Sequence, residues 1–355
     1  MTNGLLAGVR VLDFSIWRPG PYATQLLGEL GADVCKIEPP GGDPMRAYPG
    51  LFAWMNVNKR SVMLDLKSPD GRQHALALAA EADVVVEGFR PGVVDRLGVG
   101  YDDVRAINPE IVYCSLSGMG QIGDLAQASG HDLNYQAWSG ALAPEGNAPI
   151  VAAVPIADLA GGLAAAYAVC AAVVRKLRSG EGERIDCAMG DVLATWTGPV
   201  APVAEGVDRD ARGVPGYGMY AATDGYVTLA IITEDHFWSG LCDALGLDDA
   251  RDLGWLERTK HTADLQARIA AAIATRPRDE VVTELLAAGV PAAPVLDRQA
   301  MLELPHFRAR GVVTSDVSAE RTTGHPVRFE RHPAARSAPA PALDEHHEDG
   351  FLPRS

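Results

Sequence analysis

The chain has 355 residues, of which 47% are hydrophobic and 22% charged, a globular composition in a length that calls for two domains. Its net charge of −15 disfavours nucleic acid and anionic membranes as partners. The five cysteines form no CxxC pair and the N-terminus carries no basic-then-apolar signal pattern, so reduced thiols and a cytoplasmic location are expected.

The first segments alternate between strand and helix patterns. Residues 8–14 are a β-branched run between turn residues, residues 22–30 have helical periodicity, and residues 32–38 form a second strand-like run. This order predicts a parallel sheet, although no GxGxxG dinucleotide motif follows the first strand. Residues 39–55, rich in Pro and Gly, are predicted to be a long loop of the kind that is usually functional or disordered.

Three further strands extend the predicted sheet. They cover residues 58–67, 83–87 and 109–117, and Ser68 is expected to cap a helix over residues 69–80. Ligands of open parallel sheets bind at the carboxyl ends of the strands. One site should therefore lie among the loops at residues 15–21, 39–55, 88–92 and 117–131.

Residues 159–177 predict a helix that is apolar nearly all round, with an apolar run too short to be a convincing membrane span. We therefore expect it to be buried in a core or an interface. Residues 206–218, rich in Gly, Pro and Asp, are the clearest domain boundary.

A smaller domain is predicted beyond that boundary. It begins with a β-hairpin that turns at Asp224-Gly225 and continues with helices over residues 234–245, 263–274 and 278–288. A returning strand is expected over residues 324–329. The acidic tail that follows, with His346-His347, is expected to be mobile.

The predicted fold is therefore α/β in class. It consists of a Rossmann-like parallel sheet in a large domain at residues 1–204 and a small α+β domain at residues 219–310. Residues 311–355 are expected to return to the large domain and end in the mobile tail.

Two titratable residues stand out between Gly130 and Gly162. His131 and Asp158 each lie close to glycine in apolar sequence, where burial brings imidazole and carboxylate pKa values towards working pH. From the residues alone, a core histidine and a helix-capping aspartate are the more ordinary interpretation. Basic residues near the early loops of an acidic chain suggest a phosphate-bearing small molecule, with scattered surface charge as an equal alternative.

Several motifs follow one another along almost the whole chain: Leu30-Gly31-Ala32-Asp33-Val34, Asn58-Lys59-Arg60-Ser61, Leu64-Asp65-Leu66-Lys67, Glu87-Gly88-Phe89-Arg90-Pro91-Gly92-Val93 and Ser117-Gly118-Met119-Gly120-Gln121. Together they resemble the class III CoA-transferase superfamily, of the formyl-CoA transferase type. That superfamily also contains the α-methylacyl-CoA racemases.

Within the superfamily the chain is most similar to the racemases. The surroundings of His131 and Asp158 resemble the two racemase motifs, and Glu234 lies three residues before a phenylalanine, as in the small-domain motif. Transferases typically carry a glutamine in the first loop and a run of glycines in the small domain, where this chain has Trp17-Arg18 and Val214-Pro215. The resemblance therefore implies an α-methylacyl-CoA racemase-like isomerase acting on 2-methylacyl-CoA thioesters.

The racemase resemblance implies two bases. His131 and Asp158 would remove and return the α-proton on opposite faces, and Glu234 would orient or charge-tune His131. Backbone N–H groups at the start of the helix after Asp158 would stabilise the enolate oxygen. The other substrate-site residues would be cations for the CoA phosphates and neighbours of His131, namely Arg90, Lys59, Arg60, Lys67, Asp132, Asn134 and Tyr135. No metal or other cofactor is implied, because coenzyme A enters as a thioester substrate.

Two alternatives stay open. In a class III CoA transferase, Asp158 would attack the thioester and pass CoA to a carboxylic acid, and His131 would be structural or would orient the substrate. In a non-catalytic acyl-CoA-binding protein, the carboxylates would be silent. The resemblance also implies an interlocked homodimer, with each site between the large domain of one chain and the small domain of the other.

Overall fold

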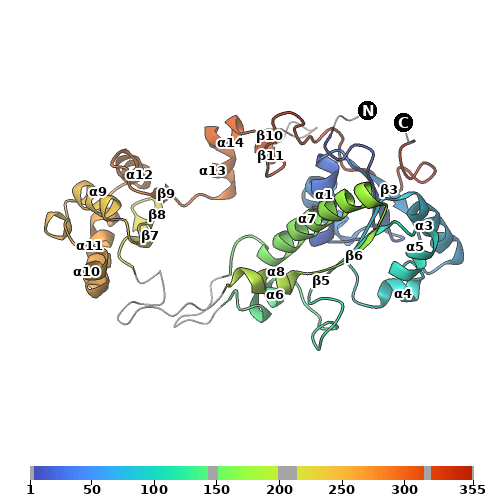
Figure 1. Ribbon diagram of the computed structural model, residues 1–355. Coiled ribbons are helices and arrows are strands. Elements are labelled where there is room, and N and C mark those ends of the chain that lie inside the picture. The colour runs from blue at the N-terminus through green and yellow to red at the C-terminus, as the bar shows by residue number, and fades with distance from the viewer. Residues whose placement is uncertain (1–3, 143–150, 199–213, 316–320, 354–355) are drawn as a thin grey trace. The chain divides into compact units, whose positions relative to one another are not determined.

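The computed structural model describes residues 4–142, 151–198, 214–315 and 321–353 (Figure 1). It divides into two compact units. The large unit comprises Met1–Gly198 and Pro305–Ser355, and the small unit comprises Pro199–Leu304. Most of the predicted boundary at residues 206–218 lies outside the described residues.

The large unit is built on a six-stranded sheet in the order β3-β2-β1-β4-β5-β6, in which every pair is parallel. The predicted parallel α/β architecture is therefore confirmed. The central strands β1 and β4 are buried along their whole length, and their inner residues are apolar. The six strands are β1 (Arg10–Asp13), β2 (Asp33–Glu38), β3 (Lys59–Met63), β4 (Val84–Glu87), β5 (Val112–Ser117) and β6 (Glu183–Ala188).

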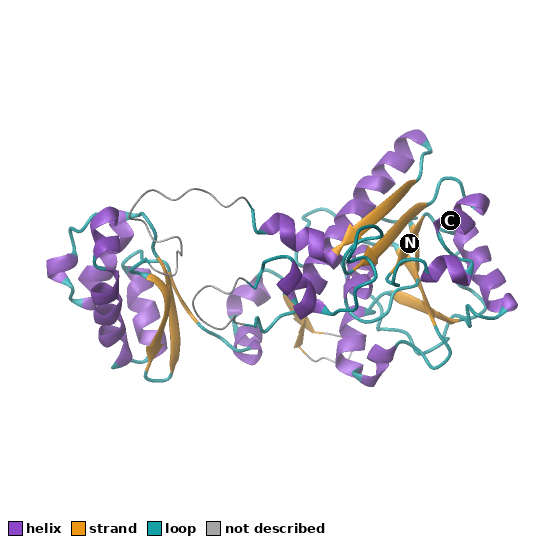
Figure 2. Cartoon of the chain, turned by 90° about the horizontal axis from the view of Figure 1, so that it is seen from below, coloured by secondary structure: helices purple, strands orange, loops and turns teal. Residues whose placement is uncertain are grey.

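Helices cover both faces of this sheet (Figure 2). Val11 contributes to a core with α1 (Pro19–Glu29) and α7 (Ile156–Ser179), whereas its neighbour Leu12 contributes to the core on the opposite face. That second core includes side chains from α3 (Pro69–Glu81) and α5 (Tyr101–Ile107). Ser68 Oγ accepts a hydrogen bond from Gly71 N at 3.0 Å, so the predicted cap of α3 is confirmed. The short helix α4 (Val93–Leu97) precedes α5.

Helix α7 is the longest helix among the described residues, and by length and hydropathy it could cross a membrane. In the structure it packs against α1, β5, β6 and α8 (Met189–Trp196). Only one face is buried, because Leu163, Tyr167 and Leu177 are 46–77% exposed. It is thus a core helix on one side and an exposed apolar surface on the other.

Two local predictions in the large unit are wrong. Residues 39–55 are not a long loop, since they contain a 3-10 helix, η1 (Pro44–Ala47), and α2 (Pro49–Met55), each with a proline in its first turn. Residues 324–329 are not a strand, and the strands near them are β10 (Val313–Ser315) and β11 (Arg321–Thr323), which form an antiparallel pair. Helices α6 (Asp132–Trp138) and α14 (Pro305–Ala309) complete this unit.

The C-terminal segment is packed rather than mobile. It follows the outer edge of β3, where His346 N donates to Ser61 O at 2.9 Å and Met63 N donates to Asp344 Oδ1 at 2.8 Å. Phe351 is 5% exposed in the core beneath α3. The expectation of a mobile tail is therefore wrong for the described residues, because the tail supplies hydrogen-bond partners to a strand edge that would otherwise face water.

The small unit has α+β architecture. Strands β7 (Tyr217–Ala222), β8 (Gly225–Ala230) and β9 (Ala292–Pro294) form an antiparallel sheet. The predicted hairpin is present, with its two-residue turn at Thr223-Asp224. The helical elements of this unit are α9 (Asp235–Leu245), η3 (Asp248–Ala250), α10 (Trp255–Lys260), α11 (Thr262–Ala274), α12 (Arg278–Ala287) and α13 (Arg298–Glu303).

Candidate active site

A cavity of about 520 Å³ lies in the large unit at the carboxyl ends of the central strands. The loops after β1, β4 and β5 line it, as predicted for residues 15–21, 88–92 and 117–131. None of residues 39–55 lines it. The acidic, basic and aromatic side chains that it brings together are Trp17, Phe89, Arg90, His131, Tyr135 and Asp158, and Asn134 lines it beside them.

Asp158 is the most perturbed acid of this cavity. It lies in the first turn of α7, and its side chain is 16% exposed. Burial raises the pKa of Asp158 to about 6, with a further rise from the nearby charge of Asp132, while Arg18 and His131 act in the opposite direction. At pH 7 the carboxylate form exceeds the acid by about ten to one. Asp158 is thus ionised at neutral pH but more basic than an ordinary aspartate.

Asp132 holds the start of α7 in place. Its Oδ1 accepts hydrogen bonds from Ala157 N at 2.6 Å and Asp158 N at 3.1 Å, and its Oδ2 accepts one from Gln136 Nε2 at 2.6 Å. Leu159 N is also occupied, by Pro155 O at 3.1 Å. The amides expected to stabilise an enolate oxygen are therefore already paired, and that prediction is wrong.

His131, Asn134 and Tyr135 form one turn at the cavity wall. His131 precedes α6, and its backbone N–H donates to Asn134 Oδ1 at 3.1 Å. The Tyr135 hydroxyl donates to Gly130 O at 2.6 Å, and its ring lies directly over Gly118. Burial and the charge of Asp158 raise the pKa of Tyr135. The structure therefore brings His131 and Asp158 to the same cavity, as the sequence predicted.

The four predicted phosphate-binding cations differ in their exposure and in their hydrogen-bond partners. Arg90 is exposed and lines the cavity, and Lys67 is exposed in the turn after β3. Arg60 is engaged by the tail, because its Nε donates to Gly350 O at 2.6 Å. Lys59 is buried, and its Nζ bonds to Asp13 Oδ2, Pro21 O and Asn56 Oδ1 at 3.0–3.1 Å. Lys59 is therefore a structural residue and the prediction that it binds a phosphate is wrong.

Glu234 lies in the small unit, at the residue before α9. It is half-buried, and its Oε2 accepts a hydrogen bond from Ile232 N at 3.0 Å. Its proposed action on His131 stays a prediction.

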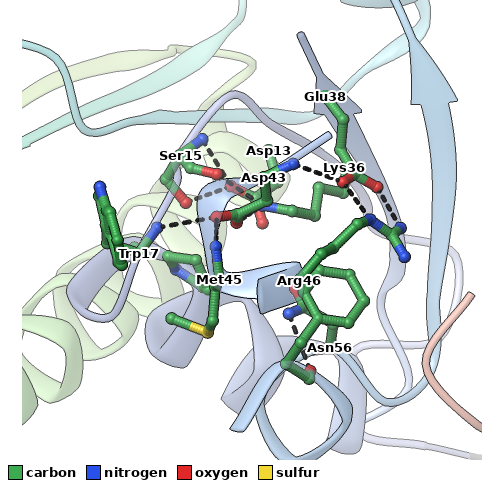
Figure 3. A network of polar contacts seen from close by, with 12 residues as sticks. Asp13, Ser15, Trp17, Lys36, Glu38, Asp43, Met45, Arg46 and Asn56 are labelled. Carbon is green, nitrogen blue, oxygen red and sulfur yellow. Dashed lines mark hydrogen bonds and ion pairs between the residues drawn. The ribbon is translucent and has the colours of Figure 1, made fainter. Parts of the chain in front are cut away.

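Sequence reasoning missed Arg18 and the buried charges behind its loop. Arg18 Nε lies 3.9 Å from Asp158 Oδ2. Beneath the loop, Lys36 Nζ lies 2.9 Å from Asp43 Oδ2, and both side chains are fully buried (Figure 3). Asp13 joins them: burial alone would raise its pKa, but Lys59 and Lys36 lower the pKa of Asp13 to about 2. The available signal was Lys36, a charged residue between Cys35 and Ile37 in the middle of a strand.

Comparisons with known proteins agree with the predicted superfamily. The family model for CoA-transferase family III matches residues 6–347. An acetyl-CoA:oxalate CoA-transferase of Acetobacter aceti is 32% identical, with 97% of this chain and 94% of that protein covered. A succinyl-CoA:mesaconate CoA-transferase of Haloarcula hispanica is 33% identical, with coverage of 97% and 94%.

Solved structures give the same result. A CAIB/BAIF family protein from Brucella suis has a TM-score of 0.85 at 29% identity, with 98% of each chain covered. A hypothetical protein from Mycobacterium tuberculosis has a TM-score of 0.87 at 30% identity, with 99% of each chain covered. The sequence, the parallel sheet and the position of the cavity agree with these relatives. The chain belongs to CoA-transferase family III.

Proposed function

We propose that this protein is an acyl-CoA:carboxylate CoA-transferase with Asp158 as its nucleophile. The observation that carries the proposal is a basic, ionised aspartate in the cavity of a chain whose similar relatives are named as transferases. The preference for a racemase rested on motifs around His131 and Asp158. The named relatives do not support that preference, and the transferase alternative fits them better.

The reaction is a sequence of acyl transfers. A carboxylate oxygen of Asp158 attacks the donor thioester carbon, the C–S bond breaks, and CoA leaves as a thiolate from a mixed anhydride. The thiolate then attacks the aspartyl carbonyl, which releases the donor acid and leaves an aspartyl-CoA thioester. The acceptor carboxylate attacks this thioester and expels the thiolate, which attacks the acceptor's carbonyl and returns Asp158 to its ionised form.

The position of Asp158 suits both halves of this sequence. A carboxylate of higher basicity is a better nucleophile, provided that it stays ionised at working pH. Burial raises the pKa of Asp158 to about 6, which meets both conditions near neutrality. The hydrogen bonds that the first amides of α7 donate to Asp132 Oδ1 fix the backbone from which Asp158 extends.

The acceptor we propose is a short dicarboxylic acid. Similar relatives are named for the transfer of CoA to oxalate, glutarate or mesaconate. The cavity of about 520 Å³ has Arg90 at its wall and Arg18 beside Asp158, so one guanidinium is available for a second carboxylate and another for the donor.

Trapping the enzyme intermediate tests the proposed function. Incubation with an acyl-CoA donor and hydroxylamine should place a hydroxamate on Asp158, located by peptide mass mapping. Asp158→Asn should lose both the trapped adduct and CoA transfer. If the protein instead exchanges the α-proton of a 2-methylacyl-CoA in deuterated water and no adduct forms, the transferase proposal fails and the racemase alternative is favoured.

His131 distinguishes the two chemistries. Under the transferase proposal, His131→Ala lowers the rate but leaves CoA transfer measurable, because no step requires an imidazole base. Under the racemase alternative, the same variant loses α-proton exchange in at least one direction.

A homodimer is part of the proposal. The outer face of α7 exposes Leu163, Tyr167, Val174 and Leu177, which are spaced to lie on one side of the helix. A second copy of the chain would remove this apolar surface from water. Light scattering after gel filtration should give twice the chain mass, and Tyr167→Glu with Leu177→Glu should lower it.

A further inference from the structure

The loop after β1 is held in one conformation from beneath. Lys36 Nζ donates to Ser15 O at 2.6 Å, and Ser15 N donates to Asp13 Oδ1 at 2.9 Å. Asp43 Oδ1 accepts a long hydrogen bond from Trp17 N at 3.4 Å (Figure 3). Trp17 has a φ of 63°, a left-handed backbone that a bulky side chain adopts only when its surroundings impose it. The buried charges therefore preorganise this loop.

Arg18 is the residue that this loop presents to the nucleophile. Its side chain is 33% exposed, and its Nε lies 3.9 Å from Asp158 Oδ2. That separation is longer than a hydrogen bond, and among the described residues Asp158 is the carboxylate with which Arg18 forms an ion pair. The guanidinium is thus close enough to balance the charge of Asp158 without being locked to it.

The proposed chemistry changes this charge balance. When Asp158 carries an acyl group or CoA, its oxygen is bonded to carbon and the residue is neutral. Arg18 then faces no ionised partner at Asp158 and has five N–H donors in a fixed fork that matches a carboxylate. A second carboxylate is recruited at that stage of the reaction.

We propose that Arg18 binds the non-reacting carboxylate of a dicarboxylate acceptor while the other carboxylate attacks the acylated Asp158. This inference rests on the proposed transferase function and assigns its acceptor specificity to one residue. Because the guanidinium lies beside the nucleophile, acceptors whose two carboxylates are separated by only a few bonds fit best. Arg90, on the loop after β4, remains available for the CoA-bearing donor.

Acceptor kinetics test this role. CoA transfer is measured at pH 8, where Asp158 is ionised in every variant, with oxalate, malonate, succinate and glutarate against acetate and propionate. Arg18→Met should raise KM for the preferred dicarboxylate by roughly ten- to a hundredfold, the loss expected for one charge-assisted interaction. KM for the monocarboxylates and for the donor should change less than threefold. Arg18→Lys should restore part of the loss.

Arg90→Met is the matched control, since it removes a second cation of the same cavity and should raise KM for the donor rather than the acceptor. Equal effects of Arg18→Met on mono- and dicarboxylates, or none on either, would overturn the inference and leave the transferase intact. If the wild-type protein transfers CoA to no carboxylate, the proposed function itself fails. Thermal unfolding of each variant shows whether a loss reflects misfolding.

Discussion

At the scale of single residues, the site depends on one carboxylate supporting another. Asp132 raises the pKa of Asp158 through its charge and, with the same side chain, holds the amides of Ala157 and Asp158. The two effects can be separated, because asparagine keeps the accepting oxygen and removes the charge.

Asp132→Asn should therefore shift the pH dependence of the enzyme while leaving α7 in place. Transfer requires ionised Asp158, so kcat/KM falls as pH drops through the pKa of about 6. Removing the charge of Asp132 lowers that pKa, and the midpoint of the acid limb should move down by roughly half a unit to one unit. A pH–rate profile measures it. Asp124→Asn, an exposed residue outside the cavity wall, is the control; an unmoved midpoint in Asp132→Asn contradicts the assignment.

Asp158→Asn should abolish transfer and stabilise the protein above neutrality. The pKa of Asp158 is raised from 3.8 to about 6, so the free energy of unfolding falls as pH rises from about 4 to about 6. Above pH 6 the full destabilising contribution of the buried carboxylate is present. The neutral variant escapes this cost, which is on the order of 2–3 kcal/mol. Urea unfolding at pH 8 should show the gain, and it should shrink at pH 5. An equal gain at both pH values would show that another cause is responsible.

At the scale of elements, close packing around α6 positions the cavity wall. Gly118 follows β5, and a Cβ there would lie 2.3–2.6 Å from ring atoms and the hydroxyl of Tyr135. The Tyr135 hydroxyl in turn holds Gly130 O, next to His131. A single methyl group at position 118 would therefore displace Tyr135 and, through its hydrogen bond to Gly130 O, the backbone next to His131.

Gly118→Ala should cost about 1–3 kcal/mol of stability, as expected for overpacking a buried contact. It should also lower kcat/KM, because Tyr135 must move. Denaturant unfolding and steady-state kinetics measure the two effects. Gly50→Ala, in α2, is the control, since a Cβ there meets nothing within 4 Å. If both variants behave alike, Tyr135 is free to shift and the wall is not rigid.

The sequence could predict the features that depend on local interactions, and it could not predict those that depend on contacts between distant segments. The strands of the sheet and the cap at Ser68 follow from local pattern, and the structure confirms them. Helix α2 was missed because prolines that begin a helix also mark loops. The prediction for Lys59 is wrong because its partners Asp13 and Pro21 are about 40 residues away in the chain, and burial that depends on such tertiary contacts leaves no trace in the local sequence.

The site shows the same division. His131 and Asp158 could be predicted from motifs, and both line the cavity. Arg18 could not, because its role depends on a distance to Asp158 across 140 residues of chain, set by how the loop after β1 meets the start of α7. Whether Asp158 attacks a thioester carbon or moves a proton depends on which substrate atom lies next to its carboxylate. The residue types in the motifs do not determine that position.

At the scale of the whole molecule, residues 344–352 complete one core and one sheet edge of the large unit. Phe351 is buried in its second core and lies 5.3 Å from the Arg10 guanidinium, while Leu352 beside it is 54% exposed. The same segment pairs with the edge of β3 through Ser61 and Met63.

Phe351→Ala should therefore destabilise the large unit by about 3 kcal/mol through loss of a buried ring. Leu352→Ala should change stability by less than about 0.5 kcal/mol, since only its backbone contributes the contacts with Asp33 and Arg10. Calorimetry of the two variants tests the pair. Equal melting temperatures would show that the tail adds nothing to the core.

The position of this tail also sets an order of events during synthesis. The small unit is complete in sequence once Leu304 has emerged from the ribosome, whereas β3 waits almost 300 residues for the segment that covers its edge. A nascent chain halted before Asp344 would leave the edge of β3 without its hydrogen-bond partners, and an open edge is prone to wrong pairing. Residues 344–351 thus complete the β3 edge and the second core of the large unit.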